Sequence, residues 1–223
     1  MNTFTEENYI KAIYQLSERS AASISTNALA EQMNTRAASA TDMLKKLALK
    51  KLISYQPYQG FNLTSKGRKL ALHVLRKHRL WELFLVDTLN FSWDEVHDIA
   101  EQLEHINSPK LVDRLDAFLD FPEADPHGDP IPDENLVFRT KRAQRLCDMK
   151  ILQPLRISGV MDHSPLFLKF MAQHQLQLGE VILIEDVNGY DASMRIKTSS
   201  DRIVFISATA AQNILTRPHH GSK

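Results

Sequence analysis

Two histidines and two glutamates lie within nine residues of one another, in the segment HDIAEQLEH. They are His97, Glu101, Glu104 and His105. In an α-helix, positions i, i+4, i+7 and i+8 share a face, so all four side chains would lie on one stripe. Imidazole nitrogens and carboxylate oxygens without a thiolate suit Mn, Fe, Zn or Ni. The spacing therefore predicts a helix that offers one face to a divalent cation, and a solvated polar face is the alternative.

Two further segments place histidine near a carboxylate. His78 and Glu82 are four residues apart in RKHRLWELFLV, and Asp125 and His127 lie in the loop FPEADPHGDPIP. A loop rich in Asp and Pro is more often only a linker, and one histidine in it proves little. Three separate segments with the same chemistry nevertheless strengthen the prediction of a metal centre.

Composition restricts the class of protein. A chain of 223 residues with 43% hydrophobic content can form one to three domains with real cores. It has no run of 18 apolar residues, and its N-terminus lacks the plan of a signal peptide. The single cysteine, Cys147, excludes a disulfide framework and a thiolate zinc site. We expect a cytoplasmic protein with no membrane partner.

The net charge of zero conceals a strong segregation of charge. Residues 1–80 carry 13 Lys and Arg against 5 Asp and Glu. Residues 81–135 carry 2 against 15, and residues 136–223 carry 12 against 7. A basic N-terminal block beside an acidic block favours two partners of opposite charge, a polyanion and a cation.

The order of expected elements in the basic block is that of a winged helix-turn-helix domain. We expect a helix over 5–21 capped by Thr5, a short helix capped by Ser25 or Thr26, a helix over about 37–50, two β-like runs around Gly60, and a long helix from Thr64 or Ser65 to about Thr88.

The rest of the chain divides into a helical part and a β-rich part. Helices are expected over about 93–107, begun by a Ser92–Glu95 capping box, and over 109–120, capped by Ser108. Residues 121–135 are expected to form an extended connector. After residue 150 the short runs LRISGVM, EVILIEDV, ASMRIKT and RIVFIS, with the helical SPLFLKFMAQHQ, predict a small barrel.

Taken in order, the segments TEENYIKAIYQL, YQGFNLTSKGRKLA, HRLWELFLVD, WDEVHDIAEQLEH and PHGDPIP resemble the diphtheria toxin repressor family of metal-dependent transcriptional regulators. The resemblance is close over residues 4–132 and weaker over 155–215, which is similar to the family's SH3-like (FeoA-like) domain. It implies a mainly α fold with α+β parts in three domains. These are a winged helix-turn-helix over 1–75, a helical dimerisation and metal-binding domain over 76–150, and a small SH3-like β-barrel over 151–223.

The resemblance also implies a homodimer that binds double-stranded operator DNA and divalent metal. The family's first metal site falls here on Glu101, Glu104 and His105, with Asn8 on the first helix. Its adjacent site falls on His78, Glu82 and His97, and in some branches on Asp125 and His127.

Three positions depart from the family's pattern. Glu101 stands where the iron branch has a cysteine, and Asn8 stands where the manganese branch has an aspartate. Lys11 stands at a nearby acidic ligand position, which puts a binuclear arrangement in doubt. Carboxylate in place of thiolate hardens the site, so Mn²⁺ is favoured over Fe²⁺.

DNA would be read by the second helix of the helix-turn-helix, whose N-terminal part enters the major groove. The residues expected at the DNA are Arg36, Ser39 and Thr41 near the bases, Lys45 and Lys46 at phosphates, and Tyr58 in the wing.

Three functions are compatible with these features. The first is a metal-activated repressor that controls metal-ion homeostasis. The second is a metal-independent winged-helix regulator with a degenerate metal site, which Asn8 and Lys11 suggest. The third is a metal-dependent hydrolase, although the paired histidines of H-E-x-x-H are missing. A chelator that leaves DNA affinity unchanged would indicate the second, and metal-dependent turnover of esters or peptides would indicate the third.

Overall fold

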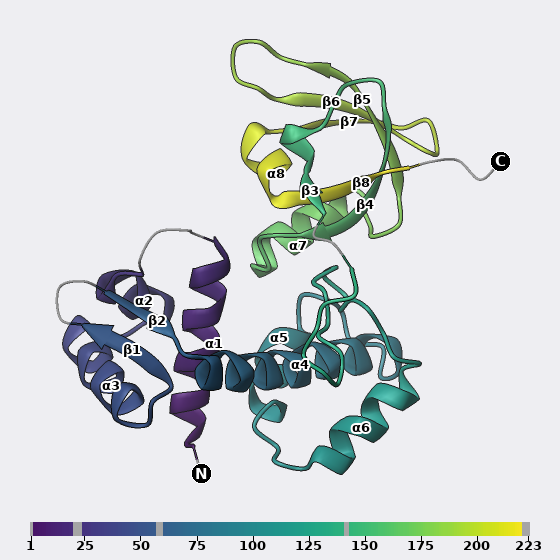
Figure 1. Cartoon of the computed structure of the whole chain (residues 1–223). Coiled ribbons are helices and arrows are strands. Elements are labelled where there is room, and N and C mark those ends of the chain that lie inside the picture. Colours follow the sequence, from purple (N-terminus) through teal and green to yellow (C-terminus); the bar gives the residue numbers. More distant parts are fainter. Residues whose placement is uncertain (1, 20–23, 57–59, 141–142, 220–223) are drawn as a thin grey trace.

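The N-terminal part of the computed structural model is a winged helix-turn-helix, as expected (Figure 1). The structure describes residues 2–19, 24–56, 60–140 and 143–219. The elements here are α1 (Phe4–Arg19), α2 (Thr26–Gln32), α3 (Ala37–Leu49), β1 (Ile53–Gln56), β2 (Gly60–Leu63) and α4 (Ser65–Asp87). Strands β1 and β2 pair antiparallel, with Ile53 opposite Leu63, and form the wing.

Side-chain caps fix where these helices begin, and one expected cap is wrong. Thr3, not Thr5, caps α1: the Thr3 amide donates to Glu6 Oε2 at 2.8 Å and the Glu6 amide donates to Thr3 Oγ1 at 3.3 Å. A reciprocal cap needs an acidic or amide side chain three residues on that can reach back, and Thr3 has Glu6 there. Ser25 and Thr64 cap α2 and α4 as expected.

Helix α4 passes from one hydrophobic core to the next. Leu75 packs in the N-terminal core with Ile10, Ile13 and Phe61, whereas Leu80 packs in a small second core formed with α6 and the 121–135 segment. The helix is continuous across position 75, so the domain boundaries 1–75 and 76–150 stay a prediction.

The central helices are α5 (Val96–Leu103) and α6 (Pro109–Phe118). Helix α5 is shorter than the expected span of 93–107. It begins after Glu95, although Glu95 Oε2 still accepts from the Ser92 amide at 3.2 Å. It ends at Leu103, and Ser108 and Pro109 start α6 after a short loop.

The C-terminal part is one antiparallel sheet in the order β3-β8-β4-β5-β6-β7, curled around its own core (Figure 1). Its elements are β3 (Gln144–Arg145), η1 (Leu146–Asp148), β4 (Pro154–Val160), α7 (Pro165–Gln173), β5 (Val181–Val187), β6 (Met194–Thr198), β7 (Ile203–Ile206), α8 (Ala208–Asn213) and β8 (Ile214–Pro218). Four strands and α7 match the expected runs, and β3, β8 and α8 are additional. Among the described residues, no helix has both the length and the apolar character to span a membrane.

The segment 121–135 is packed, contrary to the expectation of an extended connector. The Val160 amide donates to the His127 carbonyl at 2.9 Å, which joins the segment to β4. Gly128 has a positive φ of 84°, and a Cβ there would lie 2.1 Å from the Ser158 carbonyl oxygen. Only glycine permits this contact, so the segment holds His127 in a fixed place.

Candidate metal centre

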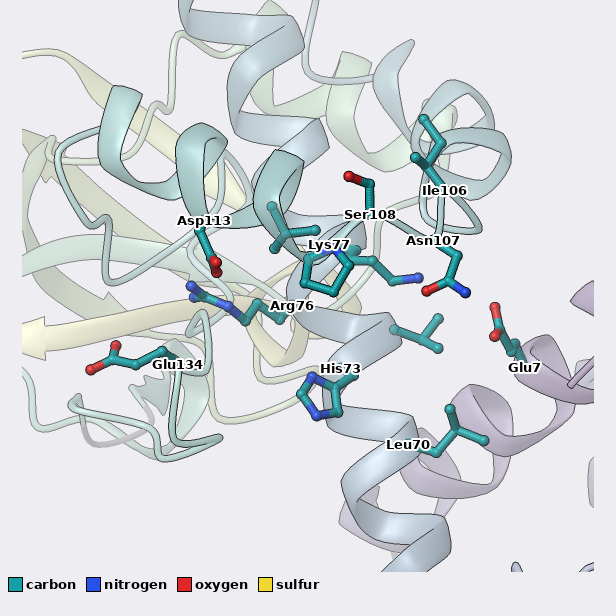
Figure 2. A pocket seen from close by; sticks show the side chains of 13 residues that line it. Glu7, Leu70, His73, Arg76, Lys77, Ile106, Asn107, Ser108, Asp113 and Glu134 are labelled. Atoms are coloured by element: carbon teal, nitrogen blue, oxygen red, sulfur yellow. The ribbon is translucent and has the colours of Figure 1, made fainter. Parts of the chain in front are cut away.

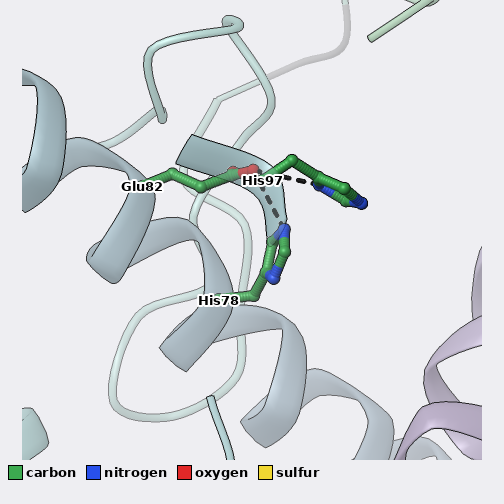
Figure 3. A group of neighbouring side chains, drawn as sticks. All are labelled: His78, Glu82 and His97. Atoms are coloured by element: carbon green, nitrogen blue, oxygen red, sulfur yellow. Dashed lines mark hydrogen bonds and ion pairs between the residues drawn. The ribbon is translucent and has the colours of Figure 1, made fainter. Parts of the chain in front are cut away.

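Glu82, on α4, is the hub of a buried cluster of histidines. Its Oε1 atom lies 3.0 Å from His78 Nε2, one helical turn away, and 3.3 Å from His97 Nδ1 on α5 (Figure 3). Its Oε2 atom lies 3.7 Å from His127 Nδ1. Among the described residues, two groups each bring three ligand atoms within 4.8 Å of one another. The first is His78, Glu82 and His97, and the second is Glu82, Asp125 and His127.

Glu104 joins three helices. Its side chain is fully buried, and its Oε2 atom accepts from His78 Nδ1 at 2.6 Å and from Lys11 Nζ, on α1, at 2.7 Å. Its Oε1 atom is buried and has no hydrogen-bond partner. Glu104 therefore has one occupied oxygen and one oxygen that is free to accept.

Of the four residues of the predicted stripe, His97 and Glu101 lie within α5, and Glu104 and His105 follow its end at Leu103. Glu104 is buried against α4 and Lys11, whereas His105 contacts the first turn of α1. His105 stacks on the Phe4 ring at 4.5 Å and its Nδ1 atom lies 2.8 Å from a Glu7 carboxylate oxygen. Its Nε2 atom lies 3.9 Å from the free oxygen of Glu104.

Asn8, on α1, and Glu101, on α5, are the remaining predicted ligands of the first site. The Asn8 Oδ1 atom is buried without a partner. Glu101 is partly exposed, and its Oε1 atom lies 3.3 Å from Lys11 Nζ and 3.6 Å from His97 Nε2. The contacts thus bring the predicted ligands His97, Glu101, Glu104 and His105 to one region, where Lys11 pairs with both glutamates.

Charges in the cluster shift the pKa values of its groups. Burial alone would lower the pKa of His78, but the carboxylates of Glu82 and Glu104 outweigh burial and raise it. Burial would raise the pKa of Glu82, and the surrounding imidazoles instead hold it well below its usual range. The pKa of Glu104 is lowered in the same way, against burial, by His78 and Lys11. These shifts favour ionised carboxylates beside a protonated imidazole.

The loop pair Asp125 and His127 is also buried. Burial, with the charges of Asp129 and Glu82, raises the pKa of Asp125 to about 7. Burial opposes protonation of His127, but the neighbouring Glu82 and Asp125 raise its pKa to about 9. His127 Nε2 donates to the Trp93 carbonyl at 2.8 Å, so Nδ1 is the atom directed at Glu82. A histidine that binds metal through one ring nitrogen usually donates the N–H of the other ring nitrogen to a carbonyl or carboxylate.

Sequence reasoning missed His163, which follows β4. Its ring stacks on the His127 ring at 4.6 Å, and its Nε2 atom is buried without a hydrogen-bond partner. Burial lowers the pKa of His163. No local pattern around MDHS signals this position, because only the packing of β4 on the 121–135 segment brings it to the cluster.

Comparison with known proteins places this arrangement in a family. Residues 1–61 match the model of the iron dependent repressor N-terminal DNA binding domain, and residues 64–133 match the model of the iron dependent repressor metal binding and dimerisation domain. A manganese-dependent transcriptional repressor solved in complex with manganese is 33% identical, with a TM-score of 0.88, over 96% of this chain and 100% of that one. The chain belongs to the diphtheria toxin repressor family.

Curated members of the family match different shares of the chain. The iron-dependent repressor IdeR of Mycobacterium tuberculosis is 34% identical over 57% of this chain and 55% of that protein. The chain thus spans about half the length of the curated relatives that it matches first. The diphtheria toxin repressor of Corynebacterium jeikeium is 26% identical over 81% of this chain and 76% of its own length. The structure of ScaR with bound Cd²⁺ is 29% identical, with a TM-score of 0.81, over 96% of this chain and 99% of that one.

The matched DNA-binding domain presents α3 as its exposed helix. Arg36 is the N-cap residue of α3 and makes no capping bond with its side chain, so the guanidinium is free to point outward. Ser39, Lys45 and Lys46 are exposed, with Lys45 3.2 Å from Asp42. Thr41 differs: its hydroxyl donates to the Ala37 carbonyl at 2.8 Å within the helix. Tyr58 lies outside the described residues.

An open hollow of about 350 Å³ adjoins the cluster between α1, α4 and the loop after α5 (Figure 2). Lys77 extends from α4 toward Asn107 and Glu7 across this hollow. Neither group of converging ligand atoms lines it. The converging ligand atoms therefore lie in the buried cluster and not in the surface hollow.

Proposed function

We propose that this chain is a metal-activated, DNA-binding transcriptional repressor that controls metal-ion homeostasis, with Mn²⁺ favoured over Fe²⁺ as the activating ion. One observation carries the proposal. Three buried ligand atoms, Asn8 Oδ1, Glu104 Oε1 and His127 Nδ1, have no hydrogen-bond partner. A buried polar atom without a partner is costly, and a bound cation would satisfy it.

The donor set fits a hard divalent cation. The first site would be held by Asn8, Glu101, Glu104 and His105, and the second by His78, Glu82 and His97, with Asp125 and His127 from the loop. All of these donors are oxygen or imidazole nitrogen, and Cys147 lies outside the cluster on η1. A bound cation would supply positive charge shared among carboxylates from different elements. Oxygen-rich sites suit Mn²⁺ better than softer metals.

Helix α1 provides the coupling between the cluster and DNA. Ile10 and Ile13 are fully buried in the core of the winged helix-turn-helix, while Lys11 contacts α5 from the same helix. A shift of α1 relative to α5 would therefore move the core on which α3 rests. Coupling of this kind must be reciprocal, so operator DNA would tighten metal binding as metal tightens DNA binding.

The proposed partners follow from charge and from exposed apolar surface. The basic residues 1–80 would meet the phosphates of double-stranded operator DNA. Within the part matched by the dimerisation model, large apolar side chains are exposed at Leu89, Phe91, Ile106, Leu111, Phe118 and Phe121. Burial of such residues in a homodimer would place two α3 helices at two half-sites. A cytoplasmic location accords with this function.

A metal-independent regulator is the second candidate, because Lys11 already pairs with Glu104 at 2.7 Å. The hydrolase interpretation loses its support, since the relatives described above are repressors.

The decisive experiment is operator selection with the full chain, in chelator and with Mn²⁺, Fe²⁺ or Zn²⁺, scored by gel shift. The proposed function predicts that one duplex is selected and that Mn²⁺ tightens its binding more than Fe²⁺ does. Equal affinity for that duplex in chelator and in every metal would instead establish the metal-independent regulator.

A further inference from the structure

Lys11 is a buried cation at the junction of α1 and α5. Only 5% of the residue is exposed, and its Nζ atom lies 2.7 Å from Glu104 Oε2 and 3.3 Å from Glu101 Oε1. Lysine is rarely buried this fully unless it is paired. Here the pairing is with two carboxylates that the family resemblance assigns to metal.

The two oxygens of Glu104 have different surroundings. Oε2 accepts from both Lys11 Nζ and His78 Nδ1, at 2.7 and 2.6 Å. Oε1 faces the other way, without a hydrogen-bond partner and 3.9 Å from His105 Nε2. The carboxylate thus has a filled side toward Lys11 and a vacant side toward His105.

A divalent ion cannot share the filled side with the ammonium group. Ligand bonds to such ions are about 2 Å long, so an ion on Glu104 Oε2 would lie within about 5 Å of Lys11 Nζ. Inside the protein, two cations that close repel strongly. The ammonium already supplies the charge that the buried carboxylate requires.

We propose that the Lys11 ammonium is a built-in cation that permanently occupies the Glu101–Glu104 side of the cluster in place of a divalent ion. Helices α1 and α5 are then joined before metal binds, and at most one divalent ion enters between them, on the Glu104 Oε1 side. This inference rests on the proposed function for the role of the remaining ion. The ammonium fixes how many ions the junction takes.

The test compares the number of Mn²⁺ ions bound per chain in the parent and in Lys11→Gln. Glutamine keeps most of the side-chain length, removes the charge and offers an amide oxygen. The proposal predicts that Lys11→Gln binds one more Mn²⁺ per chain than the parent, measured by equilibrium dialysis with metal analysis. Lys169→Gln removes an exposed lysine of α7 and is the control, with the parent's count expected. Equal counts in Lys11→Gln and the parent would overturn the proposal and leave the proposed function untouched.

Folding of Lys11→Gln with and without Mn²⁺ is a second readout. If Lys11→Gln folds only with Mn²⁺, an ion has replaced the ammonium, and the proposal stands. If it folds in neither condition, reductive methylation of the parent, read by mass spectrometry, decides. Protection of Lys11 both in chelator and in saturating Mn²⁺ supports the proposal, whereas modification of Lys11 on addition of Mn²⁺ overturns it.

The same methylation separates the two hypotheses. If the parent protein binds no Mn²⁺, the proposed function is wrong. The protection of Lys11 in chelator then still supports the built-in cation, and its modification there refutes it.

Discussion

At the scale of single residues, two buried carboxylates organise the centre. Glu82 gathers three histidines from α4, α5 and the 121–135 segment, and Glu104 ties α4 and α1 to the end of α5. Each carboxylate contacts groups that are distant in sequence. No neighbouring residue can make these contacts in its place, so substitution of either carboxylate should have a large effect on the cluster.

Glu104→Gln is expected to weaken the Mn²⁺ stimulation of DNA binding at least tenfold. The amide keeps the shape but removes the charge, and loss of groups that support a metal site typically costs about 10–100-fold. Fluorescence anisotropy with operator DNA, titrated with Mn²⁺, measures the effect. Asp98→Asn, at an exposed position on α5, is the matched control and is expected to respond like the parent. A Glu104→Gln protein with the parent's response would place the activating site elsewhere.

Mn²⁺ affinity is expected to rise with pH. The pKa of His127 is raised to about 9, so its proton must leave when Nδ1 binds metal near neutral pH. Each released proton strengthens binding by up to about tenfold per pH unit. Below about pH 7 Asp125 is protonated as well, which makes the slope steeper there. Anaerobic calorimetry at pH 6.5, 7.2 and 8, in buffers of different ionisation enthalpy, counts the protons.

The same shifts act in the opposite direction on the metal-free protein. A raised pKa in the folded state means stability that is present at low pH and is lost as pH rises, through about 7 for Asp125 and about 9 for His127. His127→Gln should flatten the pH dependence of Mn²⁺ affinity. An unchanged slope in that variant would exclude His127 as the source.

Residue types and spacing predicted the cluster's residues except His163, but not the cluster's geometry. Each of the three predicted His and carboxylate segments contributes to the cluster, because spacing on a helix or in a loop is local information. The inward turn of Glu104, the stacking of His163 on His127 and the ion pairs of Lys11 depend on how α1, α5 and β4 pack. Contacts between distant segments leave no local signal.

At the scale of elements, helix ends decided where the expectations held. The caps Ser25, Thr64 and Ser108 were confirmed, each accepting from the backbone amide three residues on. The end of α5 was misplaced because a periodic pattern continues in sequence after the helix has stopped. Strands β3 and β8 were not foreseen, since β3 has only two residues and β8 ends near a proline.

Thr3→Ala should destabilise the protein by about 1 kcal/mol, as loss of an N-cap does. Thr5→Ala should change the free energy of unfolding by only about a few tenths of a kcal/mol, because Thr5 is an exposed position inside α1 and alanine favours helix. Urea unfolding followed by far-UV circular dichroism measures both variants. A larger effect at Thr5 would contradict the capping box at Thr3 and Glu6.

Helix α3 is expected to divide its DNA contacts between bases and phosphates. Arg36→Ala should cost about 1–3 kcal/mol on the preferred operator and relax the choice of one base, since arginine reads guanine bidentately. Lys46→Ala should weaken all DNA about equally and reduce the salt dependence by about one phosphate contact. Selection from a randomised operator library distinguishes the two, and a changed sequence preference in Lys46→Ala would refute the division.

At the scale of the whole molecule, α1 is the element shared by two functions. One face of it completes the core of the winged helix-turn-helix, and Glu7 and Lys11 reach the end of α5. The 121–135 segment, fixed on β4, in turn connects the cluster to the C-terminal sheet. All three parts of the chain therefore meet at the cluster, and a cation bound there would act on their relative positions.

In the proposed function, metal and operator DNA are coupled through this cluster. The most direct measurement is the Mn²⁺ dissociation constant of the full chain with and without saturating operator duplex. The change in this constant is compared with the change in the DNA dissociation constant when saturating Mn²⁺ is added. Reciprocal linkage predicts that both constants fall by the same factor, about 5–150-fold for typical coupling. Mn²⁺ that binds tightly but with the same affinity in the presence and absence of operator would contradict this coupling.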